Sequence, residues 1–151
     1  MTERPPVPGG PVLVVGLARS GVAALEALRA RGVEATGADA GTPQTGLDGV
    51  HLATSGVELL DGIETLVKSP GVPQEAPVVV AARERGIEVM GELELAWRLL
   101  PNPFVAVTGT NGKTTTVELL GAIHRAAGVP VTVAGNVGTA LTGLDVEPDV
   151  V

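Results

Sequence analysis

Short apolar runs alternate with amphipathic stretches along the first hundred residues of the chain. Residues 11–16 form an apolar run that ends in glycine, which predicts a buried strand followed by a turn. From about Ser20 to Arg31 the apolar positions fall roughly on one face of a helix, and Gly32 supplies a stop signal. A second strand is expected over 33–39. The order of strand, helix and strand predicts a parallel βαβ unit.

The same alternation continues with weaker signals as far as residue 100. Further strands are expected over 51–53, 65–68 and 87–90, and further helices over 76–85 and 92–100. Pro101 and Pro103 then break the pattern, because proline cannot continue a helix, and they indicate a linker. Residues 1–101 are therefore predicted to form a Rossmann-like α/β domain with a parallel sheet.

After the linker the pattern starts again. A strand over 104–107, a glycine-rich loop, a helix over 113–127 and a strand over 131–133 are expected, with another buried strand opening over 148–151. Residues 102–151 therefore resemble the incomplete start of a P-loop ATPase α/β domain. We expect a truncated chain, whose unfinished second sheet exposes an apolar edge that invites self-association.

The glycine-rich loop carries the strongest chemical signal, and it comprises Gly109, Thr110, Asn111, Gly112, Lys113, Thr114 and Thr115. Backbone N–H groups of such a loop, together with a helix N-terminus, attract phosphate oxygens. Lys113 would then serve as a cation for the β- and γ-phosphates of ATP, and the Thr114 hydroxyl as a ligand of Mg²⁺. The usual pattern would place its first glycine at position 107, where Val107 stands, so only the Gly-Lys-Thr core matches.

A second motif, Gly16-Leu-Ala-Arg-Ser-Gly21, follows the first strand, and Asp39 ends the second. This arrangement resembles the dinucleotide fingerprint, in which glycines admit a pyrophosphate and an acid binds a ribose hydroxyl. Ala18 replaces the middle glycine, and its Cβ hinders the closest approach of a pyrophosphate. NAD is therefore not the natural ligand, and a purely structural turn explains the motif about as well.

Composition narrows the class of function. The formal net charge is −7 and the only aromatic residues are Trp97 and Phe104, so nucleic-acid binding is not expected. No apolar run approaches the length of a membrane span and no secretion signal opens the chain, which favours the cytoplasm. His51 and His124 lack a neighbouring acid or second histidine at metal-ligand spacing, so neither indicates a metal site.

Five segments together resemble motifs of the Mur ligase family, in the same order and over nearly the whole chain. They are residues 14–21, 68–73, 86–96, 107–115 and 134–138. The loop over 109–113 marks the wider superfamily, which includes folylpolyglutamate synthase. Ser-Pro-Gly-Val-Pro73 and Gly-Glu-Leu-Glu-Leu-Ala96 favour the members of the family that add D-glutamate.

The resemblance implies an ATP- and Mg²⁺-dependent ligase that joins D-glutamate to UDP-N-acetylmuramoyl-L-alanine through an acyl phosphate during peptidoglycan synthesis. Residues 109–115 would hold ATP, with Lys113 in the catalytic role. The residues implied to line the UDP site, or to reach the sugar, are Leu17, Ala18, Arg19, Ser20, Asp39, Gly71 and Asn136. The 151-residue chain alone is expected not to ligate, since the family's later magnesium and amino-acid sites are missing from it.

The chain departs from the family pattern after the aspartate, where Ala40 and Gly41 stand in place of a threonine or arginine. Three alternatives remain open from the sequence. One is a different Mur or folate-type ligase, the second is a nicotinamide- or nucleotide-sensing module without chemistry, and the third is a fragment with no function of its own. The turns over 68–73 and 135–138 are also compatible with purely structural roles.

Overall fold

A parallel β-sheet forms the centre of the structure, a computed structural model that describes residues 4–135, 139–144 and 150–151. Within these residues the sheet has five strands in the order β3-β2-β1-β4-β5, and every neighbouring pair is parallel. The strands are β1 (Val12–Val15), β2 (Ala35–Ala38), β3 (Val50–His51), β4 (Thr65–Lys68) and β5 (Glu88–Gly91). The predicted parallel α/β fold is thus confirmed for the N-terminal part of the chain.

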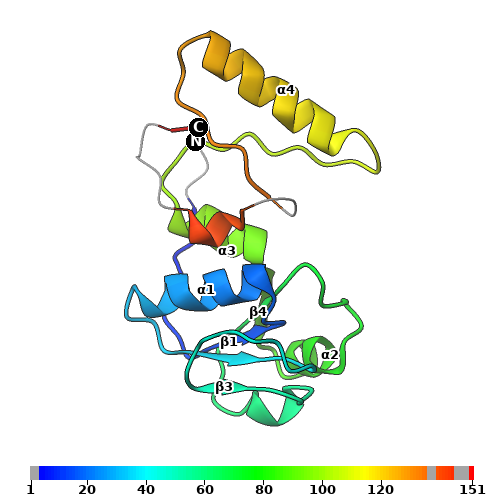
Figure 1. The fold of residues 1–151 in the computed structure, drawn as a ribbon. Helices are drawn as coiled ribbons and strands as arrows, with labels where there is room; N and C mark the ends of the chain where they lie inside the picture. The colour runs from blue at the N-terminus through cyan, green and yellow to red at the C-terminus, as the bar shows by residue number, and fades with distance from the viewer. Residues whose placement is uncertain (1–3, 136–138, 145–149) are drawn as a thin grey trace.

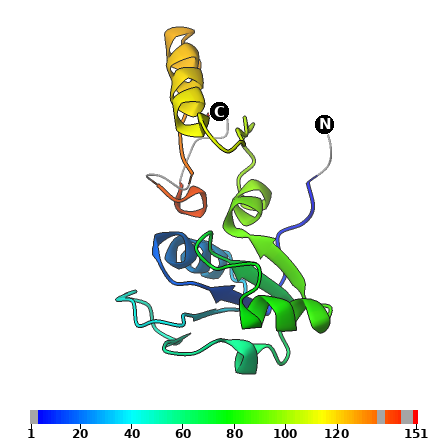
Figure 2. The same cartoon turned by 90° about the vertical axis from the view of Figure 1, so that its right-hand side faces the viewer.

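Helices cover both faces of this sheet (Figures 1 and 2). The α-helices are α1 (Arg19–Arg29), α2 (Pro77–Glu84), α3 (Glu92–Leu99) and α4 (Lys113–Ala126), and the short 3₁₀ helices are η1 (Val57–Leu59) and η2 (Leu141–Gly143). The four α-helices lie where the sequence places them, within one or two residues at each end. Neither 3₁₀ helix is predicted, because three residues are too few to show a period.

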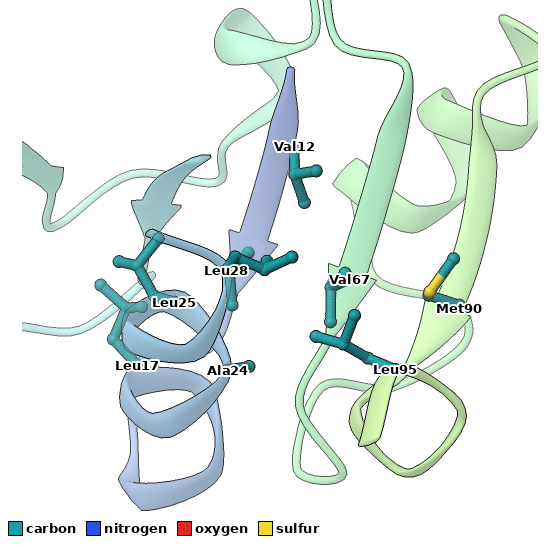
Figure 3. Close-up of a cluster of buried hydrophobic side chains, with 9 residues drawn as sticks. Val12, Leu17, Ala24, Leu25, Leu28, Val67, Met90 and Leu95 are labelled. Atoms are coloured by element: carbon teal, nitrogen blue, oxygen red, sulfur yellow. The ribbon is translucent and has the colours of Figure 1, made fainter. Parts of the chain in front are cut away.

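The central strand β1 divides the core into two layers. Val12 and Val14 face α1 and α3, whereas Leu13 and Val15 face α2, and all four side chains are buried. Figure 3 shows the first layer, in which Leu25 of α1 is buried with other apolar side chains from the helices and strands. Burial on both faces explains why β1 is a continuous apolar run without alternation. Helix α1 is therefore held against this face of the sheet.

The second part of the chain contains α4 but no assigned strand among its described residues. The predicted strands over 104–107 and 131–133 are therefore wrong for this structure. A strand needs a neighbour to pair with its backbone, and 104–107 has no backbone partner in the described part of the chain. Val151 forms backbone hydrogen bonds with the two residues on either side of Val131. Its N–H donates to Pro130 O (3.0 Å), and its carbonyl accepts from the Thr132 N–H (2.9 Å). These two bonds have the pattern of a single parallel bridge.

The predicted linker is held by the N-terminal segment. The Arg4 guanidinium donates to the carbonyl oxygens of Leu100 and Asn102, and it lies 5.6 Å from the ring centres of both Trp97 and Phe104. Cation–π contacts of this kind contribute about 0.5–1 kcal/mol each at partly exposed sites. The first described residues thus fasten the segment that joins α3 to the second part of the chain.

Across the described ranges, no helix combines the length and apolar character that crossing a bilayer requires.

Candidate functional site

A cavity of about 730 Å³ lies at the carboxyl ends of β1, β2 and β4. In open α/β sheets this edge is where ligands bind, at the point where the strand order reverses. Most of the polar and glycine residues of its wall lie just after these three strands, two follow β3, and Gly135 belongs to the second part of the chain. They are Gly16, Arg19, Ser20, Asp39, Thr54, Ser55, Ser69, Gly71 and Gly135. The sheet order therefore brings together segments that are far apart in the sequence.

The N-terminus of α1 faces this cavity. Ala18 is the N-cap residue, no side chain caps the first turn, and no acidic residue lies in it. The first amide used inside the helix is that of Val22, which donates to Ala18 O at 3.0 Å. The preceding amides of the first turn, together with the positive end of the helix dipole and the Arg19 guanidinium, provide an environment for an anion.

Two glycines of the motif are required by close packing. A Cβ on Gly21 would lie 1.8 Å from Gly16 O and 2.7 Å from the Oγ of Ser69. Gly16 has a φ of +84°, which L residues with a side chain rarely adopt, and a Cβ there would lie 2.6 Å from Val72. The turn and the helix are therefore packed backbone against backbone, and in the loop after β4 the Ser69 side chain lies close to both glycines and that of Val72 close to Gly16.

Asp39 connects three segments at the cavity wall. Its Oδ2 accepts from the Leu17 N–H at 2.6 Å, and its Oδ1 accepts from the Gly41 N–H at 2.7 Å. Its own N–H donates to His51 O at 2.9 Å. A carboxylate that accepts backbone N–H groups with both oxygens is held firmly. Asp39 thus fixes the β1–α1 turn relative to β2 and β3, in addition to facing the cavity.

The turn after β4 supplies the opposite wall. The Ser69 hydroxyl is buried and donates to Gly16 O at 2.6 Å, which ties this turn to the one after β1. The Lys68 ammonium donates to Val72 O at 2.8 Å and closes the turn on itself. Gly71 lies on the cavity wall, and no atom within 4 Å would obstruct a Cβ on it. The open space beside Gly71 is therefore accessible to a ligand.

Most of the residues expected at a UDP site lie around this one cavity. Ala18, Arg19, Ser20, Asp39 and Gly71 all line it. Leu17 is not part of the cavity lining, because its side chain is 1% exposed and belongs to the core layer between α1, α3 and the sheet. Leu17 contributes its backbone N–H to Asp39 instead. Asn136 lies outside the described residues.

Sequence reasoning missed other parts of the wall. Thr54 and Ser55 follow β3, a strand of two residues with almost no periodic signal, and Ala140 comes from the segment before η2. Gly135 is the exception, since it belongs to the turn over 134–138 that the sequence singled out. The others reach the cavity only through tertiary packing.

The predicted phosphate loop lies in the second part of the chain. Residues 110–112 form a bend, Gly112 has a φ of +78°, and α4 begins at Lys113 with no side-chain cap and no acid in its first turn. The Lys113 ammonium donates to Gly109 O at 2.5 Å, so the side chain folds back over the loop. The loop is exposed and bent, and its lysine is the first residue of α4.

Lys113 and Thr114 also line a second cavity of about 860 Å³, between α3, α4 and the segments around residues 104 and 133. Its other walls are largely apolar, with Trp97, Phe104 and Val117 among them. No group of three or more acidic, histidine or cysteine side chains able to hold a metal occurs among the residues with a described position.

Comparison with known proteins identifies relatives over most of the chain. Residues 10–91 match the family model described as Mur ligase MurD-like, N-terminal domain. UDP-N-acetylmuramoylalanine–D-glutamate ligase of Microcystis aeruginosa is 40% identical over 148 residues, covering 90% of this chain and 33% of the relative. The ligase of the same name from Frankia casuarinae is 48% identical over 141 residues, covering 87% of this chain and 30% of the relative. The chain thus spans about a third of the length of the relatives it matches.

Solved structures show the same fold at lower identity. MurC, the UDP-N-acetylmuramate–alanine ligase of Thermotoga maritima, superposes with a TM-score of 0.54 at 19% identity, covering 80% of this chain and 30% of that one. A pseudomurein peptide ligase type C from Methanothermus fervidus gives a TM-score of 0.52 at 21% identity, covering 92% and 31%. The family model matches more than half of the chain, and the matched range includes the turns after β1, β2 and β4 that line the cavity. The chain belongs to the Mur ligase family, and its first part is a MurD-like N-terminal domain.

Proposed function

We propose that this chain is the N-terminal part of a cytoplasmic, ATP-dependent ligase that adds D-glutamate to UDP-N-acetylmuramoyl-L-alanine through an acyl phosphate, in the synthesis of peptidoglycan precursors. The main support is the cavity at the strand ends, with an uncapped helix N-terminus in its wall. The two relatives named D-glutamate ligases, 40% and 48% identical to this chain, support this choice of substrate.

The cavity would hold the UDP part of the substrate. The first-turn amides of α1 and the Arg19 guanidinium would bind the pyrophosphate, because both present positive charge to the same space. Gly71 leaves room for the ligand, and Asp39 fixes the wall through the amides of Leu17 and Gly41. Asn136 is proposed, from the family resemblance alone, to reach the sugar or its pyrophosphate.

The loop Gly109–Thr115 would hold ATP. Its amides and the Lys113 ammonium would neutralise phosphate charge, and the Thr114 hydroxyl would bind Mg²⁺. ATP supplies the phosphoryl group that activates the substrate carboxylate. Positioning and charge neutralisation are the contributions of the protein to such a transfer, and Lys113 already lies against the loop at 2.5 Å from Gly109 O.

The proposed organisation has a substrate domain over residues 1–101 and the start of an ATP-binding domain over 102–151. The relatives are about three times as long as this chain, which covers 30–33% of them. Amide formation would therefore belong to a longer protein that also carries the D-glutamate site. We expect the 151-residue chain to bind the UDP substrate, to bind ATP weakly, and to form no amide.

Calorimetric titration with UDP-N-acetylmuramoyl-L-alanine tests the substrate site. In Ala18→Glu a carboxylate replaces a methyl group at the exposed N-cap of α1, where it would repel a pyrophosphate. Affinity should fall at least about tenfold, the equivalent of roughly 1.4 kcal/mol. Ala122→Glu on the exposed face of α4 makes the same chemical change away from the cavity and should bind like the unmodified chain.

Competing ligands separate this proposal from its alternatives. Tighter binding of UDP-N-acetylmuramate without alanine would favour another Mur ligase, and binding of a folate would favour the folate-type ligases. Saturable binding of NAD at the cavity would contradict the proposal. Amide formation by the 151-residue chain from ATP, D-glutamate and the UDP substrate would contradict the expected inactivity of this chain.

A further inference from the structure

A buried glutamate connects the five strands and α1–α3, here called the sheet domain, to a later segment that lines the cavity. Glu92 begins α3 and is 5% exposed, and Thr142 lies 50 residues later in η2 and is 6% exposed. One carboxylate oxygen, Glu92 Oε1, accepts from the Thr142 N–H at 2.9 Å and from the Thr142 hydroxyl at 2.8 Å. Both groups of Thr142 are therefore paired with a single side chain of the other segment.

Packing around the Glu92–Thr142 pair also holds η2 in place. Helix η2, the short orange-red helix in Figures 1 and 2, packs against both α1 and α3. A Cβ on Gly143 would lie 3.3 Å from the Cβ of Ala23 in α1, so the backbone of η2 already lies close to that helix. The N-terminus of α3 also favours a negative charge at Glu92. Because Thr142 is buried, removing the carboxylate would leave its N–H and hydroxyl donors without an acceptor, which is energetically costly.

The attachment lies two residues from the cavity. Ala140, the N-cap of η2, lines the cavity with Gly135, and the Gly135 N–H donates to Thr139 O at 3.3 Å. The position of η2 therefore sets the position of Ala140 directly and that of Gly135 through Thr139. These two residues form the part of the wall that the sheet domain does not supply.

We infer that Glu92 is a positioning residue for the nucleotide-sugar cavity. It holds Thr142, and through it residues 139–144, so that the wall at Gly135 and Ala140 is in place before a ligand binds. The identity of the ligand in this inference rests on the proposed function. The hydrogen bonds between Glu92 and Thr142 do not depend on it. A wall that is in place only part of the time lowers apparent affinity in proportion to that fraction.

The test uses the whole chain and compares Glu92→Ala with Glu94→Ala. Glu94 lies on the same helix, where it is partly exposed and pairs with Arg98 instead of η2. Hydrogen exchange measured by mass spectrometry should become faster over residues 139–144 in Glu92→Ala and stay unchanged in Glu94→Ala. The dissociation constant for UDP-N-acetylmuramoyl-L-alanine should rise about tenfold in Glu92→Ala alone, as expected if the wall is in place about a tenth of the time.

Two milder variants keep the test decisive if Glu92→Ala fails to fold. Glu92→Gln retains an oxygen that can accept both bonds and should stay within about twofold of the unmodified chain in affinity. Thr142→Val removes the hydroxyl donor but keeps the N–H, so its exchange and affinity should fall between the two glutamate variants. The same gain in exchange in Glu94→Ala, or unchanged exchange in Glu92→Ala and Thr142→Val, would overturn the attachment.

The outcome also separates this inference from the proposed function. If the unmodified chain does not bind the UDP substrate, the proposed function fails, and the exchange data still decide whether Glu92 holds residues 139–144. If it binds, and faster exchange in Glu92→Ala leaves the affinity unchanged, the role of Glu92 in positioning the cavity is wrong.

Discussion

At the scale of single residues, side-chain hydrogen bonds and glycines fix the positions of the segments around the cavity. Asp39 and Gly21 illustrate two different means. The carboxylate of Asp39 holds backbone amides from two loops, and Gly21 lets a helix and a turn approach more closely than any side chain would allow. Both effects can be tested by single substitutions with matched controls.

Gly21→Ala should destabilise the fold. The added Cβ would lie 1.8 Å from Gly16 O, which is backbone and cannot rotate away, so α1 must shift from the sheet. Overpacking of this kind costs about 1–3 kcal/mol. Urea denaturation measures the loss. Gly9→Ala, where no atom lies within 4 Å of the added Cβ, should unfold at the same urea concentration as the unmodified chain, and equal stability of the two variants would contradict the argument.

Asp39→Asn should destabilise the fold and weaken binding of the UDP substrate. The amide keeps one accepting oxygen, but its NH₂ group would face either the Leu17 or the Gly41 N–H, so one bond is lost and two donors oppose each other. The expected loss is about 1–3 kcal/mol in the free energy of unfolding. Asp61→Asn is the control, since Asp61 is exposed and its ion pair with Arg85 contributes little.

At the scale of elements, an arginine whose side chain is largely covered bonds to both β5 and α3. The Arg98 side chain is 8% exposed and bonds to Glu88 of β5 at 2.8 Å and to Glu94 of α3 at 2.5 Å. Burial disfavours its charge, but the hydrogen bonds and charges of these two carboxylates outweigh that effect and raise the pKa of Arg98. This residue joins a strand to the helix that follows it.

Arg98→Met should lower the free energy of unfolding by roughly 1–2 kcal/mol, a range reduced because both glutamates are half exposed to water. A raised pKa means that the contribution is present below the unfolded pKa and is lost only as pH rises past the folded one. The difference between variant and unmodified chain should therefore be the same at about pH 7 and about pH 9. Arg85→Met, at the exposed pair with Asp61, should change stability by less than about 0.5 kcal/mol. Equal losses in the two variants would contradict the role assigned to Arg98.

At the scale of the whole molecule, the two parts of the chain differ in packing. The sheet domain has two buried apolar layers, whereas Gly121 is the only buried residue of α4. Leu119 and Ile123 of α4 are 59% and 53% exposed, and Figure 1 shows this helix apart from the sheet. Exposed apolar surface of this kind favours association between protein molecules.

The isolated chain should therefore self-associate through α4. In sedimentation velocity runs, the sedimentation coefficient should increase with protein concentration. Ile123→Glu should remove this increase, because it adds a charge to the exposed apolar face of a chain that already carries −7. Val80→Glu changes an exposed residue on α2 in the same way and should associate like the unmodified chain. A concentration-independent coefficient for the unmodified chain would refute the expectation.

The sequence by itself determined the elements of the sheet domain and most of one cavity. Buried strands, glycine stops and helix faces are local patterns, and they placed β1, α1, α2 and α3 to within one or two residues. The glycines of the turn after β1 and the acid at the end of β2 also indicated where a ligand would lie. These features are readable because strand ends in a parallel sheet meet at one edge.

Only the tertiary structure decided which groups face that edge and which form the core. The Leu17 side chain turns into the core, Thr54 enters the wall from a two-residue strand, and Glu92 reaches a threonine 50 residues away. It also decided that 104–107 pairs with no strand in the described residues. Local sequence patterns cannot specify such contacts, because a backbone or side-chain partner is supplied by packing between segments that are distant in the chain.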